Sequence, residues 1–118
     1  MGGGFAGLAA AKALAHAPVD VTLIDRRNHH VFQPLLYQVA TAALSPADIS
    51  APIRAVLRDQ RNCQVVLAEI TAVDLAHRRL MIAGTHVDYD YLVLAAGATH
   101  AYFGHDEWAT FAPGLKSI

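Results

Sequence analysis

The sequence predicts an α/β fold, in which a Rossmann-like parallel sheet carries an antiparallel β-meander as an insertion. Three observations support this prediction. A glycine-rich stretch at residues 2–7 opens an alanine-rich helical segment. Mostly apolar runs, typical of parallel strands that are buried on both faces, occur at 19–24, where only Asp20 and Thr22 are polar, and at 91–95. Two short β-rich pieces, 79–82 and 85–88, are separated by a glycine-containing turn, which favours a meander over a helical crossover.

Local patterns define the first elements along the chain. Alanine fills the first helical segment because it has the highest helix propensity and is small enough for close packing on a sheet. Pro18 ends this segment, and Asp25-Arg26-Arg27-Asn28 leaves the following strand as a polar loop. Pro34 then occupies the first turn of a predicted helix that runs through Leu44.

The second half of the chain contains further start and stop signals. Ser45-Pro46-Ala47-Asp48 is a second helix-start signal, and the apolar spacing continues from Ile53 to Leu57. The β-rich residues 65–73 precede the meander. The run at 91–95 is predicted to be a buried strand that ends in Ala96-Gly97.

Composition excludes several classes of protein. The chain has 118 residues, of which 54% are hydrophobic and 16% are charged, so it is not an intrinsically disordered chain. The net charge is −1 and no run of Lys or Arg occurs, which argues against a nucleic-acid partner. Cys63 is the only cysteine, so no internal disulfide can form. No membrane-spanning stretch or signal peptide is recognisable, and we expect a cytoplasmic location.

The glycine-rich stretch Gly2-Gly3-Gly4-Phe5-Ala6-Gly7 fits the G-x-G-x-x-G fingerprint of dinucleotide-binding folds. Gly2 permits the tight turn, Gly4 lets backbone N–H groups approach a pyrophosphate, and Gly7 lets the helix pack closely on the sheet. The phosphates would lie at the helix N-terminus beside Phe5 and Ala6, where backbone N–H groups and the helix dipole favour an anion. The pattern alone is a weak signal, because glycine is common.

Asp25 strengthens the prediction of a dinucleotide site. It lies 18 residues after Gly7, at the end of the second predicted strand, where an acidic residue accepts hydrogen bonds from an adenosine ribose. The alternative is that Asp25 only caps a loop or pairs with Arg26. We favour the ribose role, and an acidic residue at this position argues against a 2′-phosphate on the ribose.

The fingerprint requires a strand before the glycines, yet only Met1 precedes them. We therefore expect the first strand of the sheet to be missing. It would be the central strand, flanked by those at 19–24 and 91–95, and its absence would leave a row of backbone donors and acceptors unpaired. Residues 1–118 are accordingly interpreted as one partial cofactor-binding domain.

Three segments carry a family resemblance: the glycine stretch, HHVFQPLLYQVAT at 29–41, and YDYLVLAAG at 89–97. The sequence resembles the N-terminal part of the type II NADH:quinone oxidoreductases, which are single-subunit flavoproteins with two dinucleotide-binding domains. The glycine stretch is shared by many flavoproteins, whereas residues 32–41 are much more specific to this family. Residues 102–104 and 112–118 also fit the resemblance.

The resemblance implies that the first fingerprint binds FAD. The glycines would hold the pyrophosphate, and the backbone near Glu69-Ile70 would meet the adenine. Ala96-Gly97 would pass close to the diphosphate-ribityl part of the cofactor, and residues 33–41 would run beside the ribityl chain and the isoalloxazine. The implied cofactor-binding residues are Gly2, Gly4, Phe5, Ala6, Gly7, Asp25, Arg26, Gln33, Thr41, Ile70, Ala96 and Gly97. In two departures from the family, Asp25 replaces a frequent Glu and Ala42 stands where many members have glycine.

The implied function is electron transfer from NADH through FAD to a membrane quinone, without proton pumping. The flavin carries the chemistry, so we expect no catalytic acid, base or nucleophile in this chain, and no metal site. The NADH-binding and membrane-docking parts would lie outside these residues, which alone would not turn over NADH. The full-length protein would be peripheral on the inner face of the plasma membrane, and a homodimer is a further partner that we consider.

Other functions remain as alternatives. A ferredoxin-reductase-like or sulfide:quinone flavoprotein is disfavoured by Pro34-Leu35-Leu36, and a disulfide reductase by the absence of cysteine from residues 25–50. A NAD-only dehydrogenase is disfavoured by the meander and by Ala96-Gly97. A truncated nucleotide-binding fragment without catalysis is the alternative that belongs to another class.

Overall fold

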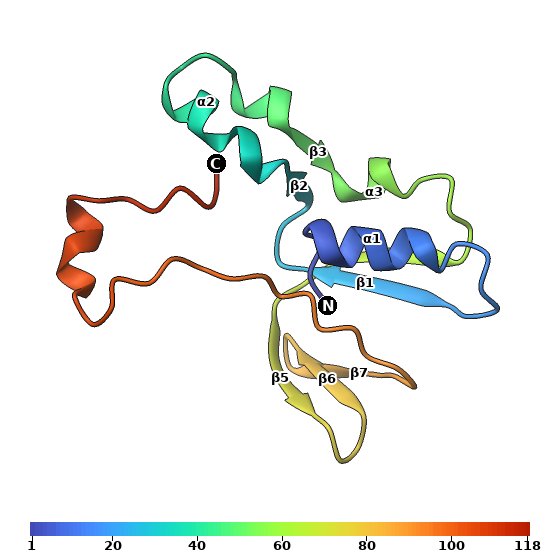
Figure 1. The fold of residues 1–118 in the computed structure, drawn as a ribbon. Coiled ribbons are helices and arrows are strands. Elements are labelled where there is room, and N and C mark those ends of the chain that lie inside the picture. Colours follow the sequence, from blue (N-terminus) through green and yellow to red (C-terminus); the bar gives the residue numbers. More distant parts are fainter. The chain divides into compact units, whose positions relative to one another are not determined.

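The computed structural model describes residues 1–118, and the chain divides into two compact units (Figure 1). Unit 1 comprises residues 1–30 and 52–97, and unit 2 comprises residues 31–51 and 98–118. The chain crosses from one unit to the other three times, and two of these crossings fall within the short strands β2 (His29–Val31) and β3 (Ser50–Pro52).

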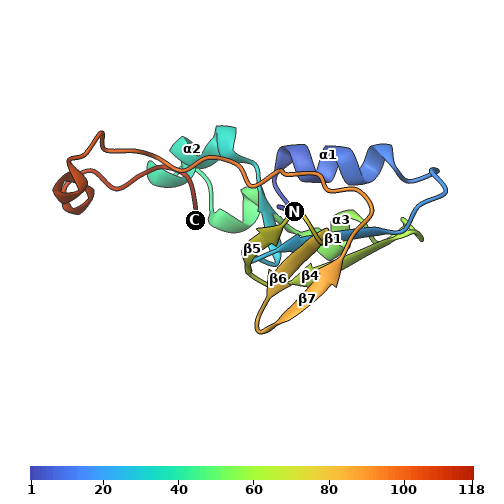
Figure 2. The same cartoon turned by 90° about the horizontal axis from the view of Figure 1, so that it is seen from below.

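Unit 1 is built on two parallel strands, β1 (Val21–Asp25) and β4 (Cys63–Leu67), which pair in continuous register. The helix α1 (Phe5–Ala13) lies along β1 in both views (Figures 1 and 2), and the short helix α3 (Ile53–Val56) contributes Ile53 to the core that they share. Their shared core consists of Leu8, Ala11, Leu23, Ile53 and Leu57. The predicted helix after the glycine stretch and the predicted parallel strand that follows it are therefore confirmed, although α1 ends at Ala13 and does not reach Pro18.

The meander of unit 1 contains β5 (Ile70–Asp74), β6 (Arg79–Ile82) and β7 (Thr85–Asp88), which pair in that order as antiparallel strands. Ala83 and Gly84, which join β6 to β7, both have positive φ, at 41° and 80°. Two positive φ values in a two-residue loop match the right-handed twist of the flanking strands. This confirms the predicted meander.

Residues 91–95 do not form the predicted buried strand. Tyr91 is 91% exposed and Leu94 is 66% exposed. The Met1 ammonium donates to the Val93 carbonyl at 2.6 Å, and the Ala95 N–H donates to the Met1 carbonyl at 2.9 Å. These two bonds have the pattern of a parallel ladder, but a single residue, Met1, cannot pair with the whole of segment 91–95.

Met1 and Gly2 lie between β1 and this exposed segment. The Gly2 N–H donates to the Ile24 carbonyl at 2.8 Å, on the opposite side from the bonds to residues 93–95. The first two residues therefore occupy the place where the sequence predicts a central strand. That a longer strand fills this place remains a prediction.

In unit 2, the helix predicted from Pro34 through Leu44 is shorter than expected. A 3₁₀ turn, η1 (Gln33–Leu35), leads into α2 (Leu36–Ala40). The Ala43 N–H donates to the Gln38 carbonyl at 2.8 Å and the Ala42 N–H to the Val39 carbonyl at 3.0 Å, with Ala42 at φ 58°. These are the bonds of a Schellman motif, which ends the helix. Ala42 thus takes the left-handed conformation that favours glycine.

The second helix-start signal forms, but the helix does not continue through Leu57. Ser45 and Asp48 make a reciprocal capping box, in which the Ser45 N–H donates to Asp48 Oδ2 at 2.8 Å. The turn that they start, η2 (Pro46–Ile49), ends before β3. The chain becomes helical again only at Ile53, because Pro52 lacks an N–H group and restricts the residue before it to extended conformations.

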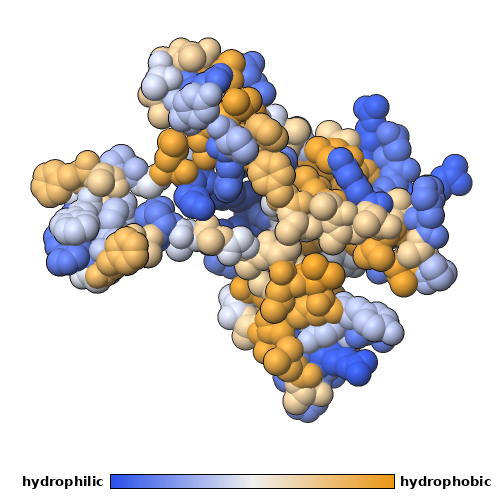
Figure 3. Space-filling model, viewed as in Figure 1, coloured by the Kyte–Doolittle hydropathy of each residue, from blue (hydrophilic) through white to orange (hydrophobic).

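Large apolar side chains are exposed in both units, and Figure 3 shows the apolar surface that they form. In unit 2, Phe103 is 91% exposed and Phe111 is 87% exposed; they flank the 3₁₀ helix η3 (Asp106–Thr110). None of the helices has the length and apolar character needed to cross a membrane.

Candidate functional site

The glycine stretch forms a tight turn that leads into α1, and two of its glycines are required by close backbone contacts. Gly2 has φ 97°, and a Cβ atom there would overlap the Ala95 carbonyl group. A Cβ atom on Gly7 would overlap the Gly2 carbonyl oxygen. Side chains at these positions would force the turn apart from residue 95 and from α1. Gly7 thus permits the close approach of α1 to the Gly2 carbonyl of the turn, and its predicted role in packing the helix on the sheet stays a prediction.

The start of α1 is open to solvent. Gly4, Phe5 and Ala6 are exposed, and a Cβ atom on Gly4 would meet nothing within 4 Å. No side chain caps this end and the first turn contains no acidic residue. Because the first N–H groups of an α-helix lack intrahelical acceptors, the open end of α1 can take an anion without competition from a carboxylate of its own first turn.

Asp25 ties this turn to the end of β1. Its Oδ2 accepts the Gly3 N–H at 2.5 Å, and its Oδ1 accepts the Arg27 N–H at 2.7 Å. The loop-capping alternative for Asp25 is therefore realised, but pairing with Arg26 is not: Arg26 lies 3.9 Å from Glu69 in an exposed ion pair. Each carboxylate oxygen can accept a further hydrogen bond, so the ribose role of Asp25 stays a prediction.

Other predicted site residues of unit 1 lie on segments that flank the turn or follow it. Ala96 and Gly97 are exposed and directly follow Ala95, whose carbonyl lies against Gly2. Ile70 is the first residue of β5 and pairs with Ile82. Its predecessor Glu69 contacts Arg26. The structure thus brings residues 2–7, Asp25 and residues 95–96 together, with Arg26 beside them in the loop after β1.

Gln33 and Thr41 belong to unit 2 and have local roles there. The Gln33 side-chain amide donates to the Lys116 carbonyl at 3.5 Å. The Thr41 hydroxyl donates to the Tyr37 carbonyl at 3.0 Å, within the last turn of α2. Their predicted proximity to the flavin remains a prediction.

His30 contacts the glycine turn, although the sequence did not assign it to the site. Its Nδ1 lies 3.2 Å from the Gly3 carbonyl oxygen, and its ring contacts the Phe5 ring edge-to-face with centroids 4.8 Å apart. The only sequence signal was its place in the family-like segment 29–41. Nothing in the local pattern indicates a contact with a residue 27 positions away.

Asn62 supports the far end of α1 in a way that the sequence also did not indicate. Its side-chain amide donates to the carbonyls of Leu14 and Val19, both at 2.9 Å. The Gln60 amide donates to the Ala11 carbonyl at 2.8 Å. Two side chains from the loop before β4 therefore donate to carbonyl groups at and just beyond the C-terminal end of the helix, in addition to the backbone N–H groups that the Ala11 and Leu14 carbonyls accept.

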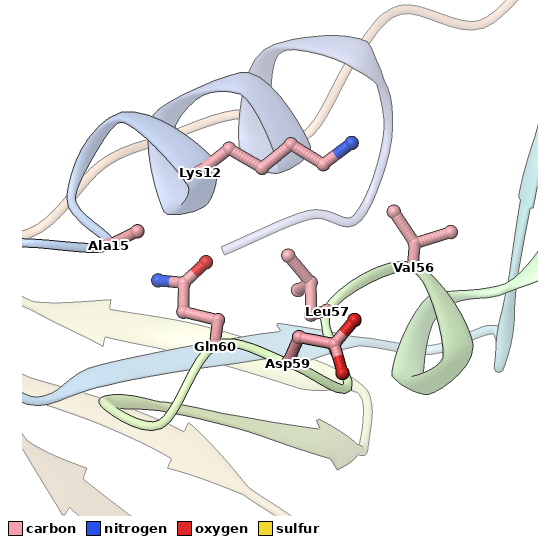
Figure 4. A pocket seen from close by; sticks show the side chains of 6 residues that line it. All are labelled: Lys12, Ala15, Val56, Leu57, Asp59 and Gln60. Atoms are coloured by element: carbon pink, nitrogen blue, oxygen red, sulfur yellow. The ribbon is translucent and has the colours of Figure 1, made fainter.

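A shallow depression of about 230 Å³ lies elsewhere in unit 1, between the C-terminal half of α1 and the segment that follows α3 (Figure 4). It is lined by Lys12, Ala15, Val56, Leu57, Asp59 and Gln60. It does not include the glycine turn. No group of three or more His, Cys, Asp or Glu side chains is arranged to hold a metal ion.

Comparison with known proteins adds to this geometry. The family model described as pyridine nucleotide-disulphide oxidoreductase matches residues 1–115. The chain belongs to this family. It is similar to two proteins of Mycobacterium tuberculosis, the type II NADH:quinone oxidoreductases NdhA (53% identical) and Ndh (52% identical). Each alignment covers 100% of this chain and 26% of the relative, so the chain spans about a quarter of these relatives. The resemblance found in the sequence is confirmed.

Solved structures of related proteins have the same fold. The sulfide:quinone oxidoreductase of Aquifex aeolicus matches with a TM-score of 0.77 and 29% identity, covering 87% of this chain and 24% of that protein. NDH2 of Plasmodium falciparum, in complex with NADH, matches with a TM-score of 0.66 and 30% identity, covering 72% of this chain and 19% of that protein. The predicted Rossmann-like α/β fold class is therefore confirmed.

Proposed function

We propose that residues 1–118 form part of the FAD-binding domain of a type II NADH:quinone oxidoreductase. The observation that carries this proposal is the glycine turn itself. Its backbone is fixed by Gly2, Gly7 and Asp25, and it ends in an exposed helix start at Gly4. Identity of 53% to NdhA along the whole chain supports the assignment of this turn to FAD.

The residues of the turn fit the diphosphate of such a cofactor. Gly4 leaves open space where a side chain would stand, so a phosphate can approach the backbone closely. The first-turn N–H groups favour negative charge, and no carboxylate in that turn opposes it. Asp25 keeps lone pairs for a ribose hydroxyl while it holds Gly3. Bound FAD would supply the hydride-accepting and electron-transferring chemistry, and these residues would position it.

The same proposal includes substrates and location. NADH would be the electron donor and a quinone the acceptor, as the names of the mycobacterial relatives state for those proteins. The complete protein would act on the inner face of the plasma membrane as a peripheral protein. The proposed assembly of the complete protein is a homodimer, which light scattering would test.

A chimera tests the proposed function. The segment of NdhA that matches this chain is replaced by residues 1–118, and the purified chimera is examined for flavin absorbance and for NADH-dependent quinone reduction. We expect both. The control chimera carries Gly7→Leu, which should lose flavin because the side chain collides with the Gly2 carbonyl. A folded chimera without flavin would overturn the proposal.

Sulfide:quinone oxidoreduction is the second candidate, because the Aquifex aeolicus enzyme shares this fold with a TM-score of 0.77. The identity of 29% to that enzyme, compared with 53% to NdhA, favours NADH as the donor. The NdhA chimera cannot decide this point, since its remaining residues come from an NADH enzyme. Placing residues 1–118 in the sulfide enzyme as well decides it: we expect flavin binding and turnover to be retained better in the NdhA chimera.

A further inference from the structure

We propose that His30 is a positioning residue for the glycine turn, and that its Nδ1–H bond to the Gly3 carbonyl strengthens the Gly4 N–H as a donor to a bound diphosphate. This inference rests on the proposed function, because it concerns the same turn. His30 lies outside the fingerprint and was not among the residues that the sequence assigned to the cofactor.

The contact between His30 and the Gly3 carbonyl defines which ring nitrogen carries the donated hydrogen. Nδ1 of His30 lies 3.2 Å from the Gly3 carbonyl oxygen, which can only accept a hydrogen bond. Nδ1 therefore carries a proton in this arrangement. The edge-to-face contact with Phe5, at an interplanar angle of 87°, holds the ring in place.

Both sides of Gly3 are held by side chains. Its N–H donates to Asp25 Oδ2 at 2.5 Å, and its carbonyl accepts from His30 at 3.2 Å. Gly3 itself is buried, and a Cβ atom there would require the end of the Ile53 side chain to move. Asp25, at the end of β1, fixes the peptide group before Gly3, and His30, in β2, fixes the peptide group after it.

The Gly3 carbonyl and the Gly4 N–H belong to one peptide group. A hydrogen bond to the carbonyl oxygen polarises that group and makes its N–H a stronger donor. Gly4 is the exposed residue at the start of α1, where the proposed site places the diphosphate. His30 would therefore act on the cofactor through the backbone, without touching it.

Two amide substitutions separate this role from packing. In His30→Asn the side-chain NH₂ stands near the position of Nδ1, whereas in His30→Gln it stands one bond further out. We expect His30→Asn to bind FAD within about threefold of the wild-type affinity, and His30→Gln to bind about tenfold more weakly, the effect of losing about one hydrogen bond. His77→Asn, which changes an exposed histidine of the meander, should leave the affinity unchanged.

Two readouts on the 118-residue chain decide the outcome. FAD affinity is measured by flavin fluorescence, and the Gly4 amide proton shift is measured by NMR without FAD. The Gly4 proton should move upfield in His30→Gln and stay near its wild-type position in His30→Asn. Equal affinities and equal Gly4 shifts in the two variants would overturn the positioning role. The proposed function fails separately, in a folded NdhA chimera without flavin, and in that case the Gly4 shifts would still decide whether His30 polarises the peptide group.

Discussion

The carboxylate of Asp25 accepts the backbone N–H of Gly3 at 2.5 Å, although the two residues are 22 positions apart in the sequence. The acidic residue at the end of β1 therefore fastens the glycine turn to the sheet. Its second oxygen holds the Arg27 N–H at 2.7 Å, so the same carboxylate also shapes the loop that leaves the strand. A residue that the sequence assigns to a ribose thus has a structural role in the free protein.

Replacing Asp25 with alanine should destabilise the fold. Two backbone N–H groups lose a charged acceptor, and we expect the free energy of unfolding to fall by about 2 kcal/mol. Urea unfolding of the 118-residue chain, followed by circular dichroism, measures the loss. Asp20→Ala removes an exposed carboxylate just before β1 and serves as the control, with a change within about 0.5 kcal/mol. Similar losses in both variants would contradict the role given to Asp25.

Replacing Ala42 with glycine should stabilise the fold. It holds the left-handed position of the Schellman motif at φ 58°, where a Cβ atom is strained. After allowing for the greater freedom of glycine in the unfolded chain, Ala42→Gly should raise the free energy of unfolding by about 0.5 to 1 kcal/mol. The matched control is Ala40→Gly, at the last residue of α2, which should lower it by up to about 1 kcal/mol. Thermal unfolding that ranks the two variants in the opposite order would refute this account.

Removing the Asn62 side chain should weaken the junction between α1 and β1. Asn62→Ala leaves the carbonyls of Leu14 and Val19 without this donor, and we expect a loss of about 2 kcal/mol in urea unfolding. Gln64→Ala, whose side chain bonds only the exposed Thr22 hydroxyl, should cost much less. Hydrogen exchange gives a second check, since the amides of residues 14–21 should exchange faster in Asn62→Ala. Unchanged exchange there would count against the capping role.

Acid should weaken the capping box of unit 2. The Ser45 backbone N–H and hydroxyl lower the pKa of Asp48 below its ordinary value of 3.8. A carboxyl whose pKa is lowered by folding stabilises the fold above its unfolded pKa, and this contribution disappears as the pH falls through the folded value. The difference in unfolding free energy between wild type and Asp48→Ala should therefore shrink from neutral pH to about pH 3. A difference that stays constant with pH would show that the charge of Asp48 plays no part.

Local signals in the sequence predicted much of the fold. The glycine stretch and Gly84 between two β-rich pieces produced the structures expected, and the Ser45–Asp48 spacing produced the expected capping box, because the relevant contacts lie within a few residues. The helix from Pro34 failed to reach Leu44 because a Schellman motif formed without glycine, on Ala42. An alanine in that conformation has no signature in a single sequence.

The remaining differences come from contacts between distant residues. The strand expected at 91–95 depends on a neighbouring strand, and Met1 alone provides only two hydrogen bonds. His30 and Asn62 act on backbone carbonyls that lie 27 and 48 positions away, at Gly3 and Leu14. Side-chain bonds of this kind follow from the assembled fold, and neither propensity nor spacing predicts them.

The most direct test of the central proposal, that the open turn at Gly4 takes the diphosphate of FAD, is an NMR titration of the 118-residue chain with FAD. The amide protons of Gly4 and Ala6 should shift downfield as they donate to phosphate oxygens, while that of Ala76 in the meander should not move. A titration in which FAD shifts the amides around Lys12 and Gln60 instead, or shifts none, would contradict the account.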